Sequence, residues 1–318
     1  MGNEVVTRLR ATGERALSEG ARHLGDVVTY DAERIRIPRA DLRAAFDSEG
    51  FGEHVPTAIE ARSALSRAAG KPVPKDIIIK AFARPHKDTP HAIGIYRQSP
   101  NASADEAGDN FVCGARIRVV ADTVLALSPE NGHAETGCFE IAERIALDAR
   151  ELLTYAETTD VTSAAISVLT GPLAGVNMRK RGGVYFLRPG SAAIWERLAA
   201  KLLPFGFVDL SYPMSDDHRS TKATGHMVKA SLESDLAALR KELAGFNEKT
   251  RDTTVEHRVA DCDALVVKSE LYADILGGWL DQLKAETSAL QDKFRKRLDK
   301  DADAFDFPKA SDEPVAAE

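Results

Sequence analysis

The sequence predicts an α+β protein: a mixed head of helices and β-hairpins, followed by a long C-terminal antiparallel helical hairpin or coiled coil. Two observations carry this prediction. Between residues 76 and 128, apolar and polar residues alternate in short β-rich runs, which is the period of strands. Beyond residue 230, leucines recur at alternating spacings of four and three, which are the a and d spacings of a coiled coil.

In the head, helical and strand-like segments follow one another. An amphipathic helix is expected at 3–24, with Leu9, Leu17 and Leu24 near one face. Further helices are expected at residues 38–50, 57–70, 139–155, 160–171 and 191–206. Strands are expected at residues 34–38, in a hairpin over 76–99, at 111–128, in a second hairpin over 176–190, and at 207–213. Glycines that favour left-handed backbone close three of the helices, at Gly50, Gly70 and Gly171.

The C-terminal pattern predicts two helices joined by a short polar loop. Their leucine seam consists of Leu232, Leu236, Leu239, Leu243 and Phe246 in the first helix and Leu276, Leu280, Leu283, Leu290 and Phe294 in the second. The second helix should outlast the first, with a kink at Gly277-Gly278. The chain then divides into an N-terminal helix (1–26), a head (27–213), a helical arm (219–300) and an acidic, disordered tail (301–318).

Composition excludes several classes of protein. The net charge is −7, with 49 acidic against 42 basic residues, so a general coat for nucleic acid is disfavoured. Three widely spaced cysteines indicate reduced thiols and a cytoplasmic location. No signal-peptide core is visible, and no stretch approaches the ~20 apolar residues that a membrane-spanning helix needs.

Arg179, Lys180 and Arg181 place three cations at the tip of the second hairpin. With the two helices before it, this hairpin resembles a winged helix over residues 139–212, and its tip would then contact phosphates. The preceding helix (160–171) contains no Arg, Lys, Asn or Gln that could read bases, so any binding would have low sequence specificity. A solvated turn at Gly182-Gly183 explains the same residues, and nucleic acid is not the favoured partner.

Catalytic and metal-binding patterns are sparse. Cys138 at a helix start, with His133 five residues earlier, is a weak candidate for a cysteine nucleophile and its base. His86 and His91 flank a turn, but surface histidines explain them better than a metal site, and no metal or other cofactor is expected. Glycine-rich phosphate-binding loops are also missing from the sequence.

Two segments resemble an uncharacterised family found in bacteria, archaea and their viruses. They are the Ile-Pro-Arg-x-x-Leu opening at 37–42 and the Gly-Gly-Val-Tyr-Phe hairpin at 182–186, and the resemblance covers roughly residues 30–215. The resemblance implies no activity for this chain, because the family supplies no activity that could be carried over to it.

The resulting expectation is a non-enzymatic assembly or adaptor protein. Leucines on the overhang of the second helix, Leu283 and Leu290 among them, should draw in a second copy or another protein, because each buried leucine is worth ~1.5–3 kcal/mol. A nucleic-acid binder of low specificity and a cysteine-dependent enzyme are the alternatives.

Overall fold

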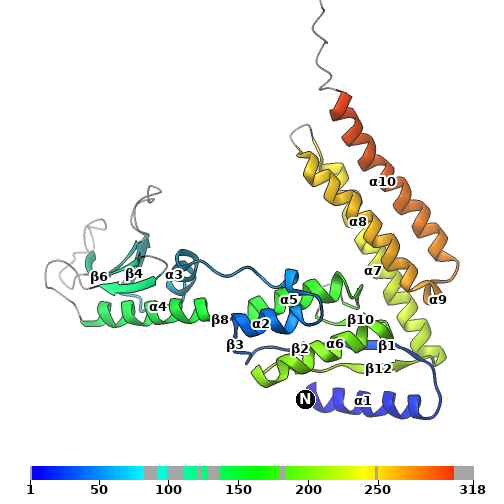
Figure 1. The fold of residues 1–318 in the computed structure, drawn as a ribbon, viewed down its shortest axis with the longest axis horizontal. Coiled ribbons are helices and arrows are strands. Elements are labelled where there is room, and N and C mark those ends of the chain that lie inside the picture. The colour runs from blue at the N-terminus through cyan, green and yellow to red at the C-terminus, as the bar shows by residue number, and fades with distance from the viewer. Residues whose placement is uncertain are drawn as a thin grey trace, which may run out of the picture. The chain divides into compact units, whose positions relative to one another are not determined.

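The computed structural model describes residues 2–81, 92–98, 111–120, 123–127, 136–179, 183–247 and 250–303 (Figure 1). The chain forms two compact units. The sheet unit comprises Asp31–Val168 and Arg197–Val208, and the helical unit comprises Met1–Tyr30, Leu169–Glu196 and Asp209–Glu318. The predicted α+β class is confirmed, and the bounds of these two units differ from those of the predicted head (27–213) and arm (219–300).

A four-stranded antiparallel sheet forms the core of the sheet unit. Its order is β4 (Ile77–Ala81), β5 (Ala92–Gln98), β6 (Phe111–Val120) and β7 (Thr123–Leu127). Alternation along these strands directs one face onto α3 (Ala61–Ala69) and α4 (Thr136–Thr154), with Ile95 and Ile117 fully buried there. Alanines on the helices, such as Ala64 and Ala142, let them approach the sheet closely.

The Ile-Pro-Arg opening has a structural role in the sheet unit. Ile37 and Pro38 form β3 (Ile37–Pro38), which pairs with β8 (Tyr155–Ala156), and α2 (Arg39–Asp47) follows directly. Arg39 donates one hydrogen bond to the Leu152 carbonyl at 2.8 Å and another to Asp160 at 2.8 Å. Both side chains of that ion pair are largely buried, so the motif fixes the fold locally.

The remaining elements of the sheet unit are short, and some segments cross the division between units. Two 3-10 helices, η1 (Gly52–His54) and η2 (Leu203–Phe205), lie within the sheet unit. The segments that run across the division are β2 (Tyr30–Asp31), α5 (Thr158–Thr170), α6 (Pro189–Leu202) and β11 (Val208–Asp209).

The helical unit contains a second four-stranded antiparallel sheet. Its order is β12 (Tyr212–Ser215), β1 (His23–Val28), β10 (Tyr185–Leu187) and β9 (Val176–Asn177). Gly25 in β1 has φ of 149°, and a Cβ there would lie 2.0 Å from the Leu187 carbonyl oxygen, so only glycine fits. The helix predicted over 3–24 is shorter in the structure. It is α1 (Gly2–Ser18), and Leu24 belongs to strand β1.

Four helices complete this unit: α7 (His218–Gly245), α8 (Asp252–Leu271), α9 (Ala273–Leu276) and α10 (Trp279–Asp303) (Figure 1). The predicted single long second helix is wrong. The chain turns between α8 and α10, where Gly277 adopts φ of 56°, and α10 packs back along α8. Gly277-Gly278 is thus part of a turn rather than a kink.

The C-terminal boundary also differs from the prediction. α10 continues through Asp303, so residues 301–303 are helical rather than part of a tail. Residues 304–318, predicted as disordered, lie outside the described residues. No described helix is both long and apolar enough to cross a lipid bilayer.

Candidate functional site

The leucine seam lies inside the core of the helical unit. Its most buried members are Leu232, Leu236, Leu239, Leu283, Leu290 and Phe294. Leu243, Phe246 and Leu276 are partly buried against them, and Leu280 is half-buried. The Phe246 and Phe294 rings pack with centroids 5.7 Å apart. The expected overhang is absent from the described helices because α10 folds back, so the predicted need for an intermolecular partner at Leu283 and Leu290 falls away.

A different surface of the same helices is open. A groove of about 570 Å³ lies between α7, α8 and the loop after α5. Ala238 of α7, Ala264 of α8 and Pro172 of the loop contribute apolar surface to it. On its α8 side, Val267 is 59% exposed and Leu271 is 46% exposed. Ala264, Val267 and Leu271 follow one another at spacings of three and four, so they form an apolar stripe on the outer side of α8.

The charged groups of the groove are paired across the two helices. Lys268 lies 3.3 Å from Asp235, and Arg258 lies 3.2 Å from Glu242 and 2.7 Å from Asp261. Two of these pairs link α7 to α8, the third lies within α8, and one carboxylate is left in excess. What the groove offers to a partner is therefore mainly apolar surface.

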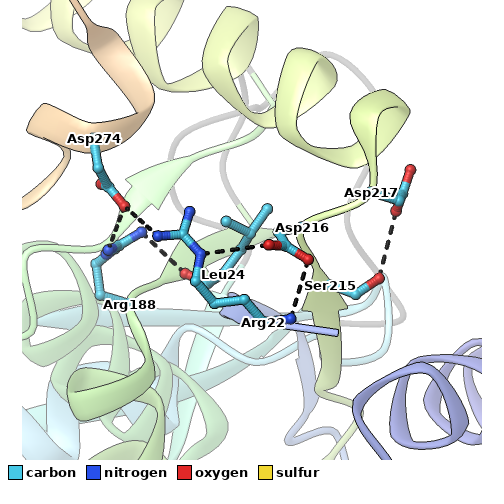
Figure 2. Close-up of polar contacts among 7 residues, drawn as sticks. All are labelled: Arg22, Leu24, Arg188, Ser215, Asp216, Asp217 and Asp274. Atoms are coloured by element: carbon cyan, nitrogen blue, oxygen red, sulfur yellow. Dashed lines mark hydrogen bonds and ion pairs between the residues drawn. The ribbon is translucent and has the colours of Figure 1, made fainter. Parts of the chain in front are cut away.

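Beyond the turn that follows α8, an ionic network holds α9 against the sheet (Figure 2). Arg188, which follows β10, donates to Asp274 of α9 at 3.0 Å and to the Leu24 carbonyl of β1 at 3.1 Å. Arg22 lies 3.7 Å from the same Asp274 carboxylate, and its backbone N–H donates to Asp216 at 3.0 Å. The network thus links the segment just before α7, the α9 turn and the sheet to one another.

Tyr272, in the turn after α8, provides a buried anchor beside that network. The Tyr272 side chain is fully buried, and its hydroxyl lies within donating distance of the Ala174 carbonyl at 2.9 Å and the Phe186 carbonyl at 3.2 Å. Burial raises the pKa of the Tyr272 phenol above its usual value. The end of α8, which carries Leu271, is thereby fixed to the sheet.

The hairpin tip is described only in part. Arg179 is exposed, whereas Lys180 and Arg181 lie outside the described residues. Below the tip, the Met178 N–H donates to the Val184 carbonyl at 2.9 Å, and β10 pairs with both β9 and β1. Tyr185 and Phe186 are both buried, so neither offers an exposed ring for base stacking.

The cysteine candidate lies in the core of the sheet unit. Cys138 is fully buried in the core between α4 and the sheet, and His133 lies outside the described residues. Its burial favours a packing role for the thiol. His86 and His91 also fall outside the described residues, and the described ones contain no cluster of His, Cys, Asp and Glu that could hold a metal.

Sequence reasoning missed the outer stripe of α8, although a signal was present. Ala264, Val267 and Leu271 repeat at spacings of three and four, and the inward residues Val255, Cys262 and Leu265 repeat at seven and three, so both sets follow the helical period. A helix that carries a second stripe has a second surface to cover.

The profile of one known family, described as a family of unknown function (DUF6744), matches residues 23–304 of this chain. This match confirms the resemblance predicted for residues 30–215 and extends it through the C-terminal helices. No curated protein and no solved structure matches the chain.

Proposed function

The chain belongs to the DUF6744 family, whose function is unknown, and we propose from its geometry that it is a non-enzymatic assembly or adaptor protein. The docking surface in this proposal is the groove between α7 and α8, in place of the buried leucine seam. The observation that supports it is the exposed stripe of Val267 and Leu271 beside a hollow of about 570 Å³. Burying one such side chain is worth ~1.5–3 kcal/mol.

The occupant that fits this groove is an amphipathic helix of another protein. A helix lying along α8 presents aliphatic side chains at i, i+3 and i+7, which is the spacing of Ala264, Val267 and Leu271. Carboxylates outnumber cations by three to two in the lining, so a basic residue flanking the partner's apolar face would fit its rim. A second copy would bring a rim of the same net sign and is the weaker occupant.

Position-dependent cross-linking tests this proposal. A photo-reactive phenylalanine analogue replaces Val267 in the full chain, and the matched control carries it at Leu147, which is 56% exposed on α4. The proposal expects a discrete protein adduct from native lysate at 267 and none at 147. Because the groove charges are already paired, the adduct should persist at ~0.5 M salt.

Two results would go against the groove, and a third would change its occupant. Equal adducts at both positions indicate non-specific capture, and no adduct at 267 removes the docking surface. An adduct of twice the chain's own mass would replace the foreign helix with a second copy.

A second candidate function, low-specificity contact with single-stranded nucleic acid, is favoured by the outer face of the sheet β4–β7. The register places Lys80, Arg116 and Arg118 on this face, and among the described strand residues it carries no carboxylate. The ring of Tyr96 lies over Gly94, where a Cβ would be 2.6 Å from it, so an aromatic surface lies along the strands. Cations beside an aromatic ring are typical of such surfaces.

Salt-dependent binding tests this second candidate. Arg116→Ala with Arg118→Ala should weaken binding of a labelled oligothymidylate and reduce its salt slope by ~1–2, because each neutralised phosphate contributes ~0.7 to the slope for single strands. The control, Arg62→Ala with Arg144→Ala, removes two exposed helix arginines and should leave the slope unchanged. Absence of wild-type binding at ~50 mM salt would eliminate this candidate.

A further inference from the structure

A second hollow in the helical unit lies next to the ionic network, because Asp216 lines the hollow and belongs to the network. It has a volume of about 690 Å³ and opens between the first half of α7 and the turn that carries α9 into α10. This volume is within the range of ~300–1,000 Å³ that small-molecule sites occupy. It shares no lining residue with the docking groove.

One wall of this cleft is cationic. Lys222, His226 and Lys229 of α7 line it together with the hydroxyl-bearing Thr221. Spacings of four and three put the three basic side chains on one side of the helix. Lys229 has Glu233 at 3.8 Å as an exposed neighbour on the same helix, a distance that leaves the pair weak.

The carboxylate in the described lining, Asp216, is already neutralised. Arg22 approaches it with its guanidinium at 3.6 Å and donates its backbone N–H to it at 3.0 Å (Figure 2). The cleft is therefore positive, although the chain from Pro213 onward has 22 acidic and 16 basic residues. A local positive hollow on an acidic segment concentrates small anions.

The opposite wall is aromatic and aliphatic. Trp279, the first residue of α10, is half-buried there beside Ile275 and Leu276. The Lys229 ammonium lies 5.1 Å from the centroid of the indole ring, so the cationic and aromatic walls meet at this point. A ligand that satisfies both walls has a flat ring at one end and several anionic oxygens at the other.

We propose that the α7–α10 cleft binds a nucleoside phosphate. The base would pack against Trp279 and the aliphatic wall, and the phosphate oxygens would accept hydrogen bonds from Lys222, Lys229 and Thr221. Phosphate fits these donors better than a carboxylate does, because its oxygens can accept from several of them at once. No hydrolysis is implied, since the sequence has no phosphate-binding loop that ends in Gly-Lys-Ser/Thr. The inference is independent of the docking proposal.

Tryptophan fluorescence gives a direct readout. The chain has two tryptophans, and Trp195 is only 1% exposed, so ligand-dependent quenching reports on Trp279. ADP is the probe, with adenosine and inorganic phosphate as its two halves. We expect ADP to quench saturably below ~1 mM, and each half to bind at least about tenfold more weakly because it meets one wall only. Iodide should quench Trp279 more strongly than caesium does.

Variants locate the site. Lys222→Ala and Lys229→Ala should each weaken ADP binding about tenfold, measured by equilibrium dialysis as well as by fluorescence. Trp279→Phe should remove the optical signal. Lys241→Ala, an exposed lysine farther along α7, is the matched control and should change nothing.

The results that would reject this proposal are equally specific. No ADP binding up to ~5 mM, an equal loss in Lys241→Ala, or inorganic phosphate binding as tightly as ADP would each reject the nucleoside-phosphate site. Val267→Asp with Leu271→Asp should retain ADP binding, which separates this inference from the docking groove.

Discussion

The two units build their cores in different ways. Every buried residue of the main sheet-unit core lies between Ala61 and Leu152, in one continuous stretch of chain. The helical-unit core draws on strands near Leu24 and Phe186 and on helices that extend to Phe294. The first core is aliphatic and rich in alanine, whereas the second includes phenylalanine and tyrosine rings. Contacts within one stretch of chain thus build the main core of the sheet unit, whereas the core of the helical unit requires segments distant in sequence.

Truncating the chain should have the largest effect and tests this difference between the two cores. Residues 57–154 contain the whole core between α3, α4 and the sheet β4–β7 and should fold alone, with dispersed amide resonances and a cooperative denaturant transition. Within residues 27–213, the predicted head, only this part should fold, because Val176 and Phe186 lose the cover of α7, α8 and α10. A native-like, cooperative 27–213 fragment would show that the helices are an appendage rather than part of the core.

A single hydroxyl should have a smaller but measurable effect. Tyr272→Phe leaves the Ala174 and Phe186 carbonyls without their phenol donor and should reduce the free energy of unfolding by about 1–3 kcal/mol. Urea titrations at neutral pH measure this. Preservation of wild-type stability would mean that the turn after α8 is held by packing alone.

The same tyrosine predicts a pH dependence. Its pKa is raised in the folded state, so the folded chain holds the proton more tightly than the unfolded chain does. That contribution to stability is complete below ~pH 10, the ordinary tyrosine value, and is lost as the pH rises above it. Stability of the wild type should therefore fall more steeply above pH ~10 than that of Tyr272→Phe. Parallel profiles would contradict this assignment.

Thiol labelling should distinguish the half-buried cysteine from the two buried ones without changing stability. Cys113, half-buried on the outer sheet face, should react first with a neutral-pH thiol reagent. Cys138 is fully buried, and burial together with Asp261 and Asp263 raises the pKa of Cys262 to about 11, so both should react at least about tenfold more slowly. Cys113→Ser should remove the fast phase. Fast labelling of Cys138 would restore the cysteine-enzyme alternative.

Much of the fold was predictable where the deciding contacts are local. The hairpin over 76–99, the helices at α3 and α4 and the inward leucines beyond Leu232 follow from periodicity, which short-range packing preserves. The β1 strand was missed because its sequence, with Gly25 inside it, has no strand signal of its own. Its pairing with β10 and β12 supplies the stability that its sequence does not indicate.

The candidate site was predicted less well for a related reason. Spacings of three and four continue on both sides of Tyr272, so they cannot distinguish one long helix from two that fold together. A positive φ at Gly277 decides that question, and it moves Leu283 and Leu290 from an expected overhang into the core. Which apolar stripe of α8 remains uncovered then depends on α10, which sequence periodicity does not position.

The central claim is that the leucine seam is core and the outer α8 stripe is surface. Thermal unfolding of two matched double variants tests it directly. Leu283→Asp with Leu290→Asp places two charges in the buried core of the helical unit and should abolish the cooperative transition of that unit. Val267→Asp with Leu271→Asp changes exposed residues and should keep the wild-type midpoint within about 2 °C. The reverse outcome, a stable seam variant and an unfolded stripe variant, would contradict the account.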